Sequence, residues 1–65
     1  MDLQGIGQRI RQRREARDLT LEELAREVDI TLGRLAQIER GAPPRVDRLV
    51  AIARGLGCSA SELMD

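Results

Sequence analysis

The sequence has no phenylalanine, tyrosine, tryptophan, histidine or lysine, and it has a single cysteine. Without aromatic rings, the core must be assembled from Leu, Ile, Val, Ala and two Met side chains, which suits short helices that pack through aliphatic ridges. The β-branched residues are too scattered to predict strands. The apolar runs fall far short of the roughly 20 residues that a membrane span needs, and the N-terminus lacks the long apolar stretch of a signal peptide. We therefore expect a soluble, cytoplasmic protein made of helices.

The shortage of cysteine and histidine limits the chemistry that the chain can support. Cys58 has no partner for an internal disulfide, and a chain without histidine or a second cysteine cannot form a structural zinc site. We expect Cys58 to lie in the core. No Cys–His or Ser–His pair and no glycine-rich phosphate loop is present, so catalysis has little support. The sequence indicates neither an enzyme nor a cofactor nor a metal.

Charge is balanced, with 11 arginines against 11 acidic residues in 65 residues, so net charge gives no argument for a nucleic-acid partner. The distribution of the arginines along the chain gives a weak argument for such a partner. Five arginines fall within nine residues, opposed only by Glu15: Arg9, Arg11, Arg13, Arg14 and Arg17. Such a run can bind phosphates, or it can simply form a solvated helix face.

Apolar spacing and capping signals predict up to five helices in a single domain, residues 1–65. Leu3, Ile6 and Ile10 give the first helix its apolar face. Residues 20–23, Thr-Leu-Glu-Glu, and residues 59–62, Ser-Ala-Ser-Glu, have the form of capping boxes. The expected helices span approximately residues 4–17, 21–28, 32–40, 46–56 and 60–64.

The second and third helices are expected to lie close together in the chain and to cross sharply. Asp29 can adopt a left-handed conformation between them, Thr31 can cap the third helix, and Gly41 can end it. A connection of about three residues has helix-turn-helix spacing, in which the two helices cross sharply instead of lying antiparallel as a hairpin.

Three segments carry a family resemblance: Leu19-Thr-Leu-Glu-Glu-Leu-Ala25, Thr31-Leu-Gly-Arg-Leu-Ala-Gln-Ile-Glu-Arg-Gly41 and Leu49-Val-Ala-Ile-Ala-Arg-Gly-Leu-Gly57. The chain resembles a Cro/C1-type (XRE family) helix-turn-helix domain over roughly residues 5–64, and within that family it is similar to regulators in which such a domain precedes a cupin sensor. The resemblance implies an all-α, lambda-repressor-like bundle of four to five helices. It also implies a transcriptional regulator, a repressor, that binds double-stranded DNA sequence-specifically.

In that family the third helix enters the major groove and presents side chains to base edges. The resemblance places Leu32, Gly33, Arg34 and Gln37 there. Gln37 can contact adenine, Leu32 can pack on a thymine methyl group, and Gly33 can let the backbone approach closely. Alternatives stay open for three of these residues. Leu32 can instead be a helix-start contact, Gln37 can be a solvated residue, and Arg34 can be either a phosphate ligand or a solvated residue.

The resemblance places phosphate contacts at the N-termini of the second and third helices, marked by Thr20, Leu21 and Thr31. Many relatives carry Gln where this chain has Leu21, which leaves only a backbone N–H there. Arg40 is a candidate phosphate contact. Arg45 is a candidate for the minor groove, or else a solvated loop residue.

The family resemblance also implies two structural features. Arg14 is expected to pair with Glu39 inside the fold. A single recognition helix binds weakly, so a homodimer on a palindromic operator is expected, with half-sites about one helical turn apart. The expected dimer surface consists of Leu56, Cys58, Leu63 and Met64.

One rival interpretation is a protein-interaction module that keeps the helix-turn-helix fold without binding DNA, because a fold does not fix a function. Zero net charge and the two leucines at the starts of the second and third helices favour it. Salt dependence separates the two, since only phosphate contacts make affinity fall steeply with ionic strength.

Overall fold

The chain folds as five helices in a computed structural model that describes residues 3–64, with side chains described from residue 5 onward. No strand occurs in this part of the chain, so the predicted all-α bundle is confirmed. The expected helix bounds agree with the observed ones to within one residue. The helices are α1 (Leu3–Ala16), α2 (Leu21–Val28), α3 (Leu32–Glu39), α4 (Val46–Leu56) and α5 (Ala60–Met64).

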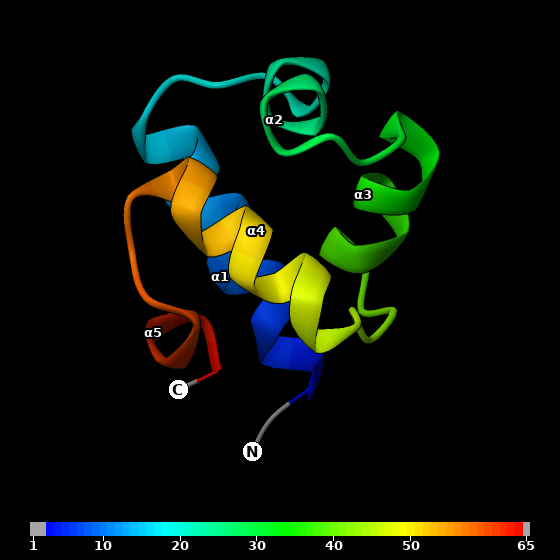
Figure 1. The fold of residues 1–65 in the computed structure, drawn as a ribbon, viewed down its shortest axis with the longest axis vertical. Helices are drawn as coiled ribbons and strands as arrows, with labels where there is room; N and C mark the ends of the chain where they lie inside the picture. The colour runs from blue at the N-terminus through cyan, green and yellow to red at the C-terminus, as the bar shows by residue number, and fades with distance from the viewer. Residues whose placement is uncertain (1–2, 65) are drawn as a thin grey trace.

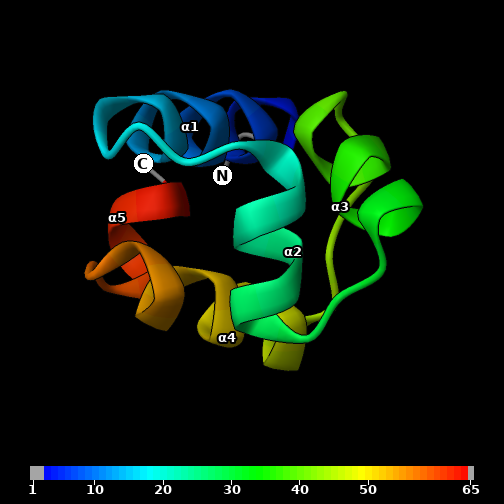
Figure 2. The ribbon, with the colours of Figure 1, turned by 90° about the horizontal axis from the view of Figure 1, so that it is seen from above.

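The helices surround one core, with α1 along one side (Figures 1 and 2). Helix α1 packs against α3, α4 and α5, and α2 packs against α3 and α4. Helix α3 therefore lies at the edge of the molecule, supported from behind by α1 and α2. None of the described helices has both the length and the apolar character needed to span a membrane.

Aliphatic side chains from all five helices form this core. The fully buried ones are Ile6, Ile10, Leu24, Leu35, Ile38, Ile52 and Leu63. The side chain of Leu3, which the apolar spacing also assigns to the core, lies outside the described residues. Cys58 is half-buried and packs against the edge of the core instead of inside it.

Two of the four residues of the expected dimer surface are buried. Leu56 is 5% exposed and Leu63 is 0% exposed, because both side chains pack into the core of their own chain. Neither side chain offers much surface to a second molecule. Cys58 and Met64 are half-buried at the core edge.

Four helices end on a residue in the left-handed region: Asp18, Asp29, Gly41 and Gly57. At each end, the N–H of the next residue donates to a carbonyl five residues back, as Ala42 does to Gln37 at 2.9 Å. This is the Schellman arrangement, which satisfies the last carbonyl groups of a helix and turns the chain sharply. Short connections and sharp turns allow a chain this small to enclose a core.

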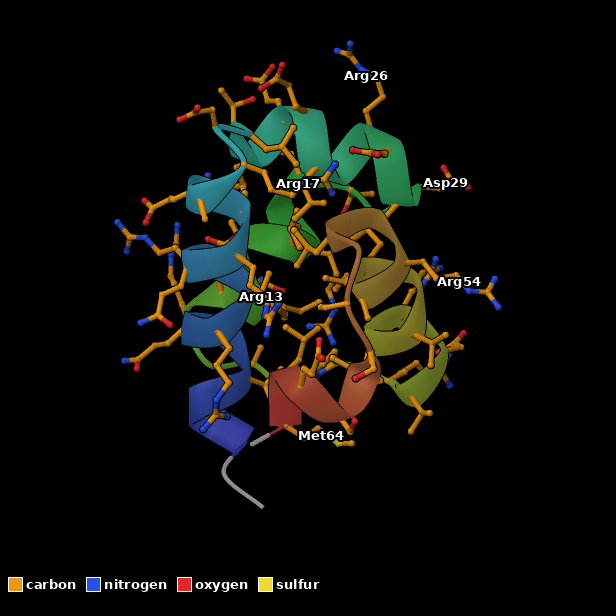
Figure 3. All side chains as sticks on the ribbon, turned by 90° about the vertical axis from the view of Figure 1, so that its left-hand side faces the viewer. Arg13, Arg17, Arg26, Asp29, Arg54 and Met64 are labelled. Carbon is orange, nitrogen blue, oxygen red and sulfur yellow. The ribbon has the colours of Figure 1, made fainter. Side chains whose placement is uncertain are left out.

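Arginines of the run at residues 9–17, in and just after α1, make contacts within the protein. Arg9 and Arg13 reach α5, through the Leu63 carbonyl at 3.3 Å and the Glu62 carboxylate at 3.7 Å, respectively. Arg17 donates to the Gly55 carbonyl at 2.6 Å. These three arginines recur every four residues. Arg13 and Arg17 lie between α1 and the C-terminal helices, whereas Arg26 and Arg54 point outward (Figure 3). The run therefore fastens the C-terminal helices to α1.

Candidate nucleic-acid interface

A three-residue turn, Asp29 to Thr31, joins α2 to α3. Asp29 adopts the expected left-handed conformation, with φ 58°. Ile30 is 8% exposed and is anchored in the core. The Thr31 hydroxyl accepts a hydrogen bond from the Arg34 N–H at 3.2 Å, so it caps α3 as predicted. The buried Ile30 fixes the direction in which α3 leaves the turn.

The start of α2 is fixed by the predicted capping box. The Thr20 hydroxyl accepts from the Glu23 N–H at 3.1 Å, and the Glu23 carboxylate accepts from the Thr20 N–H at 2.8 Å. The hydrogen bond from the Thr20 N–H, and after it one from the Thr20 side chain, lower the pKa of the Glu23 carboxyl below its usual range. Leu21 is half-buried and packs against the core, which gives an apolar residue at this position a structural reason.

The outward face of α3 collects three of the expected base-reading residues. Leu32 is 44% exposed although it is apolar, and Gln37 is exposed. A methyl group built on Gly33 would meet nothing within 4 Å, so the helix backbone is bare at this point. The opposite face of α3 buries Leu35 and Ile38. Helix α3 is therefore anchored to the core on one face and exposed to solvent on the other, at the edge of the domain.

The Arg34 side chain makes contacts that could not be predicted from the sequence. Its side chain is half-buried and bends back along the surface, where Nη2 donates to the Pro43 carbonyl at 3.2 Å. Nη1 donates to Oε1 of Gln37 at 3.5 Å. Both alternatives left open for Arg34, a phosphate ligand and a solvated residue, overlook these contacts. The Pro43 carbonyl gives no sequence signal, because every residue has a carbonyl.

Two exposed arginines follow the outward face of α3 along the chain. Arg40 is the C-cap residue of α3, and Arg45 precedes α4. Neither guanidinium has a hydrogen bond or ion pair within the described residues. Both cations are therefore free to contact an anionic partner.

The Arg14–Glu39 pair lies behind α3. Its two hydrogen bonds measure 2.7 and 3.1 Å, and the two side chains are only 13% and 8% exposed. Arg14 also donates to the Leu19 carbonyl at 2.8 Å. The hydrogen bonds that Arg14 donates to Glu39 raise the pKa of Arg14. The pair thus ties the end of α3 to the end of α1 and to the loop before α2.

Comparisons with known proteins agree with this geometry. A family model described as helix-turn-helix matches residues 10–63. The chain is similar to the biofilm master regulator SinR, solved in complex with DNA, with 34% identity, a TM-score of 0.88, and coverage of 92% of this chain and 98% of that one. It is also similar to the restriction-modification controller protein C.AhdI from Aeromonas hydrophila, with 30% identity, a TM-score of 0.90, and coverage of 95% and 96%.

A third similar structure is the DNA-binding domain of the P22 C2 repressor, with 31% identity, a TM-score of 0.88, and coverage of 98% of this chain and 86% of that one. A search of the curated proteins finds no match.

Proposed function

Because the chain belongs to the Cro/C1-type helix-turn-helix family of DNA-binding transcription regulators, we propose that it reads an operator by placing α3 in the major groove. The observation that carries this proposal is the outward face of α3, where Leu32, Gly33 and Gln37 are exposed on a helix fixed from behind. An α-helix fits the major groove of B-DNA, which is about 12 Å wide.

Each exposed feature of this face has a proposed partner on the duplex. Gln37 contacts a base edge, Leu32 packs on a thymine methyl group, and Gly33 lets the backbone approach the bases. The N–H groups at the starts of α2 and α3 bind phosphates, with Thr20, Leu21 and Thr31 marking these ends. Arg40 contacts a phosphate, and Arg45 enters the minor groove.

The proposed regulator acts as a repressor in the cytoplasm, as a homodimer on a palindromic operator. One recognition helix reads only a few base pairs, so two copies with half-sites about one helical turn apart supply the affinity that one lacks. Of the expected dimer surface, Cys58 and Met64 remain as candidates, because they lie at the edge of the core.

Selection from a randomised duplex pool at two salt concentrations tests this function. We expect enrichment of a palindromic sequence and a steep fall of affinity with salt, because each neutralised phosphate releases counterions. Gln37→Ala should cost about 1–3 kcal/mol of discrimination at one base pair of each half-site. Arg45→Ala should weaken binding and reduce the salt slope.

The rival interpretation makes the opposite prediction in the same experiment. A protein-interaction module enriches no sequence and fails to bind duplex DNA even at low salt. That pair of results would reject operator reading and leave the outward face of α3 as a protein-binding surface.

Gly33→Ala separates DNA binding from folding. Nothing lies within 4 Å of the added methyl group, and alanine is better than glycine inside a helix by about 0.5–1 kcal/mol. Urea unfolding should therefore show a slightly more stable domain. Affinity for the enriched operator should nevertheless fall, because the methyl group occupies the space between helix and bases. Unchanged affinity would show that the backbone does not approach DNA at this residue.

A further inference from the structure

The amide of Gln37 is already oriented in the free protein. Its Oε1 lies 3.5 Å from Nη1 of Arg34, one turn earlier on α3. A guanidinium has only donors, whereas an amide has one acceptor and two donors at its end. Gln37 must therefore turn its oxygen toward Arg34, since the opposite orientation would place donor against donor.

The loop after α3 keeps the guanidinium of Arg34 in place. Nη2 of Arg34 donates to the Pro43 carbonyl at 3.2 Å, and no acidic side chain in the described part of the chain forms an ion pair with Arg34. Two of its five N–H groups are used in the contacts with Gln37 and Pro43. The other three remain, next to the two donor hydrogens of the Gln37 amide. This part of the α3 face, the Arg34–Gln37 pair, thus has several free donors while its best side-chain acceptor is engaged.

Guanine is the only base that offers two acceptors, O6 and N7, and no donor at its major-groove edge. Adenine offers an acceptor and a donor, so its donor must share the Gln37 amide oxygen with Arg34, whereas guanine needs only the free donors of the pair. We propose that Arg34 is a positioning residue for Gln37, and that the pair selects guanine where Gln37 alone would select adenine. This inference rests on the proposed operator reading and names the base that the same site reads.

The first test repeats the pool selection with Arg34→Ala and with Arg40→Ala as the matched control, since both remove one positive charge from the α3 segment. At the position that Gln37→Ala relaxes, the unaltered protein should select guanine. Arg34→Ala should select adenine there by about ten-fold, because the freed amide can pair with adenine through both of its atoms. Arg40→Ala should weaken binding to all sequences and keep the preference for guanine.

The second test uses the unaltered protein, so it does not depend on how well a variant folds. Replacing the selected guanine with 7-deazaguanine removes N7 and should weaken binding about five-fold, the usual cost of one lost hydrogen bond. Inosine keeps O6 and N7 and lacks only the minor-groove amino group, so it should bind as guanine does.

The outcomes separate this inference from the function on which it rests. Adenine selected by the unaltered protein, guanine kept by Arg34→Ala, or full affinity for 7-deazaguanine would each overturn the role of Arg34 and leave operator reading intact. A pool from which no sequence is enriched would overturn both. Circular dichroism of Arg34→Ala confirms that a change of base preference comes from a folded domain.

Discussion

Gly7→Ala is expected to lower the free energy of unfolding by about 3 kcal/mol, the upper part of the usual range for an overpacked site. A methyl group on Gly7 would collide with the carbonyl oxygen of Ile38 and lie 2.7 Å from that of Glu39. Both atoms belong to the backbone of α3, so neither can move aside as a flexible side chain would. The helices must separate, and α3 loses its support from α1.

Gly33→Ala is the matched control for this prediction, because it makes the same change in a helix where the added group meets nothing. Helix propensity alone would stabilise both variants by about 1 kcal/mol. Urea unfolding followed by circular dichroism should instead move the two midpoints in opposite directions. A domain of this size has only about 3–5 kcal/mol of stability to lose, so Gly7→Ala should retain at most about 2 kcal/mol. A midpoint equal to that of the unaltered protein would show that α1 and α3 can separate at little cost.

Breaking the Arg14–Glu39 pair is the second change with a large expected effect. Removing one partner leaves a charge in a site that water barely reaches, which costs about 3–5 kcal/mol. Arg14→Met should be the more damaging of the single changes, because it strands the Glu39 carboxylate. After Glu39→Leu, the guanidinium of Arg14 keeps the Leu19 carbonyl as an acceptor.

The double variant Arg14→Met with Glu39→Leu tests whether the cost comes from stranded charge. Two apolar side chains can replace a buried ion pair with little loss of stability. We expect the double variant to recover most of the stability lost by Arg14→Met, measured as the free energy of unfolding in urea. If the losses of the two single variants add together in the double variant, the two residues stabilise the domain independently and not as a pair.

The two glycines of these experiments show where prediction from sequence stops. Gly7 and Gly33 both lie inside helices, each between an apolar and a polar residue. The structure places one against the backbone of α3 and the other facing outward. The distinction depends on how α1 crosses α3, which sequence spacing does not specify.

The burial of Leu56 and Leu63 could not be predicted for the same reason. Leu56 lies between Gly55 and Gly57, and Leu63 lies in the short helix α5. From sequence alone, an apolar side chain in either place can face a second molecule or its own core. Burial in the structure assigns both to the core. The hydrogen bonds of Arg9, Arg17 and Arg34 to backbone carbonyls could not be predicted either, because every residue has a carbonyl.

The helices, their ends and the helix-turn-helix could all be predicted from local features of the sequence. Capping residues such as Thr20 and Thr31 act on N–H groups within one turn, and apolar spacing acts at three to four residues, so both can be read locally. Contacts between distant parts of the chain establish which glycine packs against α3, which leucines are buried, and which way the Gln37 amide points. The first two depend on packing between helices distant in the chain. The third depends on the Pro43 carbonyl, brought beside Arg34 by the fold of the loop.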